Sequence, residues 1–205
     1  MIRLDRDGPV WTLTLDRPDK ANALTREMLT QIRDAAAEAE QAGLAALILT
    51  GTGRVFSSGA DIEAARAGLA TDGVWEEVSS RIARLPFLTV AALNGTLAGG
   101  AFGMALACDL RLAVPGANFF YPVMRLGFLP QPSDPARLAA LVGPSRARML
   151  LMAGQKIDAE TALAWGLVDR IVPGESLVDE ARALAEAPAA APEHIRRTIK
   201  RMIPG

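Results

Sequence analysis

The chain has 205 residues, half of them hydrophobic, and its 22 basic and 23 acidic residues give a net charge of −1. This length suits one compact domain whose core is large enough to fold without cross-links. The near-neutral balance provides no clustered basic face, so nucleic acid is not an expected partner. The single cysteine, Cys108, lies in an apolar run and is predicted to be a buried free thiol of a reducing compartment.

No targeting or membrane segment is predicted. The N-terminus alternates like a strand and lacks the charged and apolar regions of a secretory signal. The most apolar stretch, 88–113, is interrupted by asparagine, glycine and aspartate, which a membrane span would exclude. We therefore expect a cytoplasmic protein without a membrane partner.

The first half of the chain alternates strand and helix patterns, which favours a parallel α/β arrangement. Strands are predicted at 10–16, 45–50, 88–93 and 110–114, and helices at 25–43, 60–70, 74–85 and from about 100 to Cys108. After Pro130 the pattern is mainly helical, at 135–142, 145–153, 159–165 and 177–187, with a local hinge predicted at 187–192. No repeat or linker marks a second domain.

Two glycine-rich loops each join a buried strand to a helix start: 55–62 (VFSSGADI) and 94–103 (NGTLAGGAFG). The first amides of a helix lack internal acceptors and attract negative charge, so an oxyanion or phosphate can bind there. For either loop alone, an ordinary strand-to-helix turn explains the pattern as well.

Together the two loops resemble the paired signature of the enoyl-CoA hydratase/isomerase (crotonase) family, and RPDKANAL and GQKIDAETALAWGLVDRIVP resemble its flanking motifs. The resemblance implies an α/β fold, the crotonase-like ββα spiral (ClpP/crotonase fold), in one domain over residues 1–205. A spiral core would span about 1–135, and a shortened helical region, about 136–205, would serve oligomerisation. Longer members build a trimer or a dimer of trimers with further helices, so a homotrimer or hexamer is expected.

By this resemblance the backbone amides of Ala60 and Gly100 form an oxyanion hole for an acyl-coenzyme A thioester. No cofactor is bound, and coenzyme A enters as part of the substrate. Removing one oxyanion donor costs other enzymes on the order of a few kcal/mol. The resemblance also assigns substrate-binding positions to Lys20, Ala21, Asp61, Ile62, Gly99, Gly103 and Val123. From the residues alone, Lys20 reads as a solvated turn lysine and Asp61 as a helix-start carboxylate.

The chain departs from the family at its two catalytic glutamates. The members that add water carry them where this sequence has Gly103 and Val123, and neither residue transfers a proton. General acid–base catalysis contributes about a hundred- to ten-thousandfold, so efficient hydration is not expected.

Three other side chains are candidates for the missing chemistry. Gln131 matches an alternative catalytic position of the family, although an amide cannot act as a base. Asp134 could be a base if it pointed inward, but Asp before Pro favours a helix cap. Tyr121 could donate a hydrogen bond into the pocket, or be a core aromatic with a satisfied hydroxyl. Glu63 reads as a first-turn helix carboxylate, and the only histidine, His194, as a surface residue. One histidine and one cysteine predict neither a metal site nor a Ser-His-Asp triad.

These residues favour a lyase or isomerase that stabilises an enolate through its oxyanion hole. Decarboxylation suits these residues best, because loss of carbon dioxide forms the enolate directly and needs no base. Double-bond isomerisation needs one proton shuttle, which Asp134 or Glu63 would have to provide. A non-catalytic acyl-CoA-binding protein and a weak hydratase are the alternatives.

Overall fold

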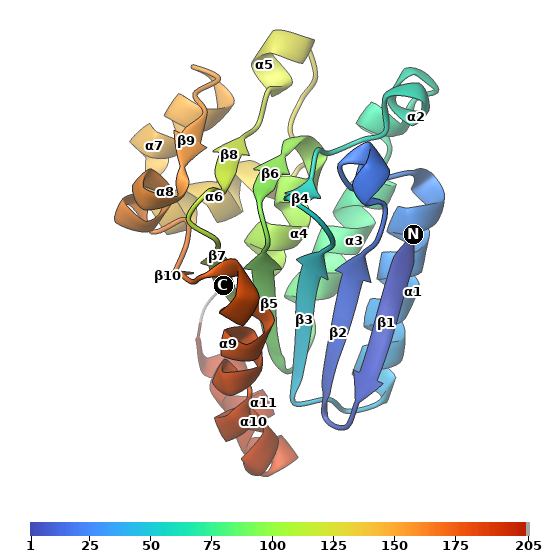
Figure 1. Cartoon of the computed structure of the whole chain (residues 1–205), viewed down its shortest axis with the longest axis vertical. Coiled ribbons are helices and arrows are strands. Elements are labelled where there is room, and N and C mark those ends of the chain that lie inside the picture. The colour runs from blue at the N-terminus through green and yellow to red at the C-terminus, as the bar shows by residue number, and fades with distance from the viewer. Residues whose placement is uncertain (204–205) are drawn as a thin grey trace.

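The computed structural model describes residues 1–203, which form two β-sheets with helices packed around them (Figure 1). The larger sheet has the order β1-β2-β3-β5-β7-β10. Its strands are β1 (Ile2–Asp7), β2 (Val10–Leu15), β3 (Ala46–Gly51), β5 (Leu88–Leu93), β7 (Leu110–Ala113) and β10 (Arg170–Ile171). β1 runs antiparallel to β2, and every other neighbouring pair is parallel. The predicted parallel arrangement is therefore confirmed.

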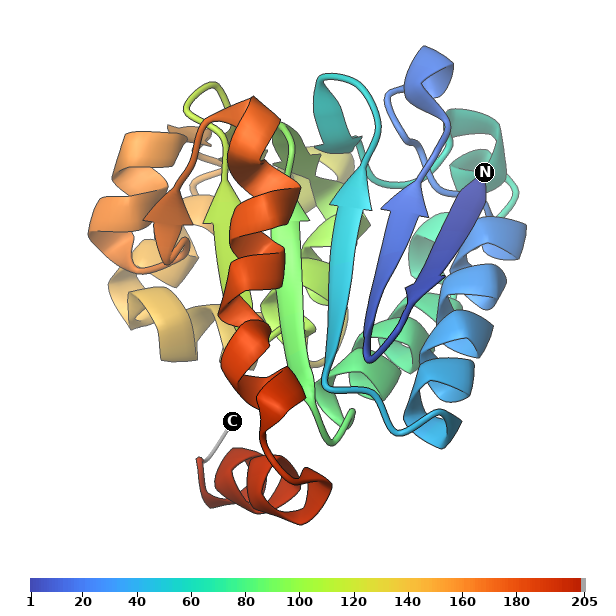
Figure 2. The same cartoon turned by 60° about the horizontal axis from the view of Figure 1, so that its bottom comes forward.

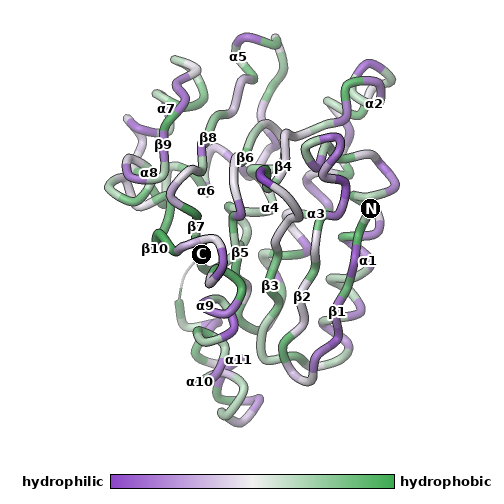
Figure 3. Tube along the Cα trace, in the orientation of Figure 1, coloured by the Kyte–Doolittle hydropathy of each residue, from purple (hydrophilic) through white to green (hydrophobic). Residues whose placement is uncertain are grey.

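Helices cover both faces of this sheet, which explains why its central strands β3 and β5 are mostly apolar. α1 (Arg26–Gln41), α3 (Val74–Ala83) and α4 (Phe102–Ala107) pack in sequence behind the strands, and α9 (Leu177–Leu184) crosses the opposite face (Figure 2). The hydropathy trace shows hydrophobic colour along much of β3 and β5 (Figure 3). β3 and β5 are buried along nearly their whole length.

The long elements begin and end where the sequence predicts. Thr25 caps α1, since its side chain accepts a hydrogen bond from the Met28 amide at 3.2 Å. Gly43 follows the helix with a left-handed φ of 66°. Cys108 is buried and free, and burial, the largest influence, raises the pKa of its thiol to about 12.

A second, smaller sheet agrees with the crotonase-like spiral that the resemblance implies, but its strands were not predicted from the sequence pattern. Its order is β4-β6-β8-β9, with β4 (Val55–Ser57), β6 (Thr96–Ala98), β8 (Asn118–Phe120) and β9 (Ile157–Asp158). Each strand has only two or three residues, too few to show a strand period. β9 and β10 also come from the region that the sequence marks as helical, and each adds the last strand to one sheet.

The remaining helices surround the two sheets. They are α2 (Ile62–Arg66), α5 (Val123–Leu126), α6 (Asp134–Val142), α7 (Pro144–Leu151), α8 (Ala159–Trp165), α10 (Glu186–Ala190) and α11 (Glu193–Met202), with 3-10 turns at Pro18–Lys20, Leu69–Thr71, Gly99–Ala101 and Gly174–Ser176. The hinge predicted at 187–192 is wrong for most of its length, because α10 runs through Ala190. Within residues 1–203 no helix combines the length and apolar character needed to cross a bilayer.

Candidate active site

The two glycine-rich loops lie side by side at the end of the parallel strands. β4 pairs with β6 in parallel, so the segments that follow these strands leave the small sheet next to each other. Gly59 has a left-handed φ of 93°, and a Cβ atom there would lie 3.0 Å from the Ala98 carbonyl oxygen and 3.5 Å from the Gly100 nitrogen. Only glycine permits this close approach of the two backbones.

The amides of Ala60 and Gly100 are available to a ligand. Among residues 1–203, neither amide donates a hydrogen bond to a backbone or side-chain acceptor, although the flanking amides of Gly59 and Asp61 do. Gly100 lies in the first turn of a 3-10 helix that continues into α4, where helix amides have no internal acceptor. Two amides without a protein acceptor therefore lie on adjoining loops, and an oxyanion hole requires such donors.

The loop at residues 17–23 packs against the same place. Arg17 forms an ion pair with Asp61 at 2.8 Å, and the Ser58 amide donates to the Ala21 carbonyl. Asp61 caps α2 by accepting from the Glu63 and Ala64 amides, as expected for a helix-start carboxylate. The hydrogen bond from Arg17 is the main reason that the pKa of Asp61 is lowered.

The residues proposed to contact coenzyme A are accessible. Lys20 and Ile62 are exposed, and Ala21 and Asp61 are partly exposed. The loop that carries Lys20 and Ala21 packs on the loop that carries Ala60 and Asp61 through the Ser58–Ala21 hydrogen bond and the Arg17–Asp61 ion pair. Their binding roles stay predictions.

A buried carboxylate lies where the family places its first glutamate. A Cβ atom at Gly103 would lie 3.0 Å from Asp134 Oδ1, so the carboxylate of Asp134 packs directly against α4. The side chain of Asp134 has no exposed surface, and the Tyr121 hydroxyl donates to Oδ2 at 2.8 Å. The predicted helix cap is therefore wrong: α6 begins at Asp134 itself, and its carboxylate turns into the core.

The surroundings of Asp134 suit proton transfer near neutral pH. Burial is the largest influence and raises the pKa of Asp134 to about 7, although the Tyr121 hydrogen bond and the charge of Arg137 act in the opposite direction. Within the described residues, Oδ1 has no hydrogen-bond partner. Gly103 lies about one helical turn after Gly100, so Asp134 lies about one turn from the free amide of Gly100.

Tyr121 donates a hydrogen bond to Asp134 and does not face an open pocket. It is buried, and its ring stacks on Phe102 with centroids 5.3 Å apart. Burial, followed by the nearby charge of Asp134, raises the pKa of its hydroxyl well above the ordinary range, so it remains a hydrogen-bond donor. This confirms the interpretation of a core aromatic with a satisfied hydroxyl.

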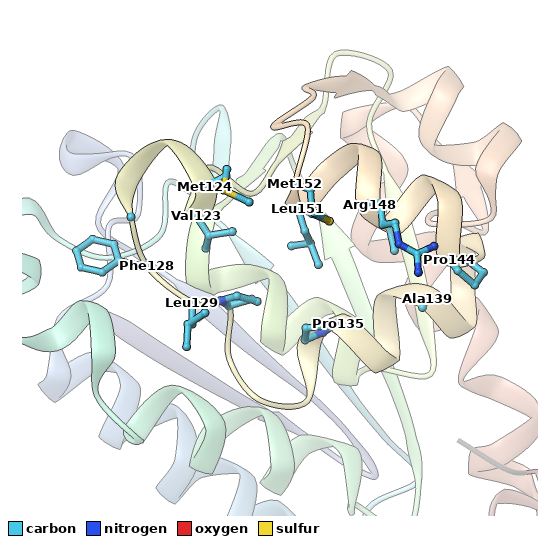
Figure 4. Close-up of a pocket in the computed structure, with 13 residues that line it drawn as sticks. Val123, Met124, Phe128, Leu129, Pro135, Ala139, Pro144, Arg148, Leu151 and Met152 are labelled. Carbon is cyan, nitrogen blue, oxygen red and sulfur yellow. The ribbon is translucent and has the colours of Figure 1, made fainter.

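Val123 opens onto an apolar pocket, separate from the two amides. The pocket has a volume of about 440 Å³ and lies between α5, α6 and α7, with Met124, Leu129, Pro135, Leu151 and Met152 among its lining residues (Figure 4). Pro130 also lines this pocket. The next residue, Gln131, is buried, and its backbone amide donates a hydrogen bond to the Tyr121 hydroxyl at 3.4 Å.

The other candidates lie outside the site or support it indirectly. Glu63 is in the first turn of α2, and His194 is exposed on α11, both as predicted. Glu76, on α3, gave no signal in the sequence, because one glutamate on an amphipathic helix is usually a solvated residue. In the structure Glu76 accepts two hydrogen bonds from Ser133, the residue before Asp134.

The class of protein is defined by comparison with known proteins, which agree with this α/β fold of two sheets. A family model described as enoyl-CoA hydratase/isomerase matches residues 5–203. The chain is 36% identical over 197 residues to a carnitinyl-CoA dehydratase of Citrobacter koseri, and 34% identical over 188 residues to a Mycobacterium bovis protein named "Probable enoyl-CoA hydratase". Each match covers 90% of this chain and 73% of the relative.

Solved structures agree with the sequence comparisons. An enoyl-CoA hydratase from Bacillus anthracis is similar with a TM-score of 0.91 at 30% identity, over 98% of this chain and 81% of the other. An enoyl-CoA hydratase/isomerase from Pseudoalteromonas atlantica has a TM-score of 0.91 at 29% identity, with the same two coverages. The chain therefore belongs to the enoyl-CoA hydratase/isomerase (crotonase) family and has its fold, as predicted. It is a family enzyme for acyl-CoA thioesters.

Proposed function

We propose that the protein is an isomerase that moves a double bond in an enoyl-CoA thioester, with Asp134 as its single proton-transfer group. One observation carries this proposal: the carboxylate of Asp134 lies against Gly103, where the family glutamate is missing, with a pKa of about 7. A group with a pKa near the working pH can both accept and return a proton.

The reaction needs two proton transfers and one stabilised intermediate. Asp134 removes a proton from the carbon chain of the thioester, and the electron pair shifts onto the carbonyl oxygen to give a dienolate. The amides of Ala60 and Gly100 donate hydrogen bonds to this oxygen. Asp134 then returns the proton to a different carbon, so the product has the same atoms as the substrate and a shifted double bond. Tyr121 orients the carboxylate through its hydrogen bond.

The substrate contacts that we propose are those that the family resemblance implies. We assign the adenine and ribose end of coenzyme A to Lys20 and Ala21, and the pantetheine arm to Asp61 and Ile62. Gly99, in the 3-10 turn before α4, and Gly103, within α4, let the backbone lie close to the thioester, and the apolar pocket beside Val123 suits a hydrocarbon acyl group. Gln131 can orient a polar group by hydrogen bonding.

Decarboxylation of a β-carboxyacyl thioester is the second candidate. It is favoured by the complete burial of Asp134, whose Oδ2 already accepts from Tyr121. This reaction breaks the bond to carbon dioxide, leaves its electron pair on the enolate, and needs only the oxyanion hole before solvent protonates the product. The carboxylate of Asp134 would then be dispensable.

A panel of purified thioesters separates these reactions. β,γ-Enoyl-, crotonyl-, β-hydroxyacyl- and β-carboxyacyl-CoA are incubated in D₂O and analysed by mass and by absorbance of the conjugated product, with saturation binding measured in parallel. Isomerisation with little deuterium uptake, lost in Asp134→Asn and kept in Glu160→Gln on the exposed surface of α8, supports the proposal. Carbon dioxide release that persists in Asp134→Asn supports the decarboxylase. Rapid hydration of crotonyl-CoA, or binding without turnover, rejects both.

We further propose a cytoplasmic homo-oligomer, a trimer or a hexamer. The support is α11, which exposes an apolar strip made of Ile195, Ile199 and Met202, with Ile203 following the helix. Residues four and three apart lie on one helix face, so the strip is continuous and suited to contact with a second copy. Light scattering of the purified protein tests the proposal, and a monomer at all concentrations would contradict it.

A further inference from the structure

Glu76 connects α3 to the start of α6. Its carboxylate accepts a hydrogen bond from the Ser133 hydroxyl at 2.5 Å and another from the Ser133 amide at 3.1 Å. The Ser80 hydroxyl, one turn along α3, donates to the same carboxylate at 2.7 Å. Glu76 is half-buried, so these bonds are partly shielded from water. Three donors converge on a side chain that contacts neither the free amides nor Gly103.

The position of this network matters because Ser133 immediately precedes Asp134. The Asp134 amide donates to the Gln131 carbonyl and the Arg137 amide to the Ser133 carbonyl, so residues 131–137 form one connected turn. Ser133 has no side-chain cap of its own for α6, and Glu76 supplies a carboxylate at this helix start from another helix. If the turn moved, Asp134 would leave Gly103.

We propose that Glu76 is a positioning residue for the proposed reaction: by accepting both hydrogen bonds of Ser133, it fixes the start of α6 and holds the Asp134 carboxylate against Gly103. This inference rests on the proposed function, in which Asp134 transfers the proton. Glu76 acts through Ser133 and contacts no reacting atom.

Glu76 also acts on Asp134 through its charge. The groups that face Asp134 are Tyr121 from the β8–α5 segment, Arg137 from α6 and Glu76 from α3, while α4 contributes the uncharged Gly103. Tyr121 and Arg137 favour the ionised carboxylate, and the negative charge of Glu76 disfavours it. Removing that charge therefore lowers the pKa of Asp134 and shifts the acidic limb of the pH–rate profile to lower pH.

The experiment compares four variants of the full chain. Glu76→Ala removes both the acceptor and the charge, Glu76→Gln keeps an acceptor oxygen without the charge, and Ser133→Ala keeps the charge but removes the hydroxyl. Glu77→Gln is the matched control, because Glu77 is the next residue of α3, is exposed, and pairs with Arg33. kcat and KM are measured against pH on the thioester that the wild type converts, and the Asp134 carboxyl is titrated by 13C NMR.

We expect Glu76→Ala to lower kcat about tenfold or more, the effect of losing a charged hydrogen-bond acceptor, while KM changes less than about twofold. Glu76→Gln should recover part of kcat and shift the acidic limb to lower pH. Ser133→Ala should lower kcat without moving that limb, and Glu77→Gln should match the wild type.

Unchanged kcat and an unchanged acidic limb in both Glu76→Gln and Ser133→Ala would overturn the inference, even if Glu76→Ala does not fold. The failure of the proposed function is recognised separately, because the wild type would then convert no enoyl thioester. In that case the NMR titration still decides: a lower Asp134 midpoint in Glu76→Gln than in the wild type supports the contact, and an identical midpoint overturns it.

Discussion

Replacing Asp134 with asparagine should change how stability depends on pH. A pKa raised from its ordinary 3.8 to about 7 means that the folded state holds its proton after the unfolded state has lost it. Below pH 3.8 both states are protonated and the group has no effect. Between pH 3.8 and 7 the free energy of unfolding falls as pH rises, by about 1.4 kcal/mol per pH unit, and above pH 7 the loss is constant. The free energy of unfolding is therefore about 4 kcal/mol lower above pH 7 than below pH 3.8, as far as this one group determines it.

Asparagine cannot ionise, so the Asp134→Asn variant should not lose stability as the pH rises. Its free energy of unfolding relative to the wild type should therefore increase by about 4 kcal/mol in total from about pH 4 to about pH 8. An unpartnered amide NH₂ costs about 1–3 kcal/mol at every pH, so it shifts the difference without changing its slope. Urea unfolding of both proteins, followed by tryptophan fluorescence at half-unit pH steps, measures the slope. Glu160→Gln, on an exposed surface, is the control. Parallel stability curves for wild type and Asp134→Asn would refute the argument, because the buried carboxyl would then titrate alike in both states.

Three further changes test other parts of the structure. Gly59→Ala should lower kcat/KM at least tenfold and the free energy of unfolding by about 1–3 kcal/mol, because the φ of 93° and the Ala98 oxygen at 3.0 Å oppose a Cβ atom. Turnover and urea unfolding measure the two effects. Wild-type values of both would contradict the proposed oxyanion geometry. Thr25→Ala should cost about 1 kcal/mol by removing the cap of α1, whereas Gln31→Ala on its exposed face should not, as urea midpoints will show. Cys108 should resist iodoacetamide at about pH 8 until urea unfolds the chain, since burial raises its pKa to about 12; fast native labelling, measured by mass, would contradict this burial.

The long elements were predictable because their signals are local. The cap at Thr25, the stop at Gly43 and the continuous apolar run of β5 each act within a few residues, and β5 begins and ends as predicted. The strands of the small sheet could not be located from local patterns, because β9 has two residues and depends on pairing with β8, some forty residues earlier. Such short strands are specified by their partners and not by their own sequence.

The candidate site divides in the same way. The two loops that carry the free amides were predictable from the sequence, because their glycines indicate where the backbone turns. The direction of Asp134 does not, since Asp before Pro is an equally good helix cap. What turns the side chain inward is the missing Cβ of Gly103 and the hydroxyl of Tyr121, which meet it only in three dimensions. Glu76 had no sequence signal for the same reason.

The late arrival of β10 has a consequence for synthesis on the ribosome. β10 pairs with β7, so the outer edge of β7 stays unpaired until the chain reaches Arg170. At about 5–20 residues per second, the interval after Ala113 lasts roughly 3–11 s. Unpaired strand edges favour association with other chains, so nascent chains held in this interval are the most prone to aggregate. A delay in translation before residue 170 would therefore lower the yield of folded protein more than a delay after it.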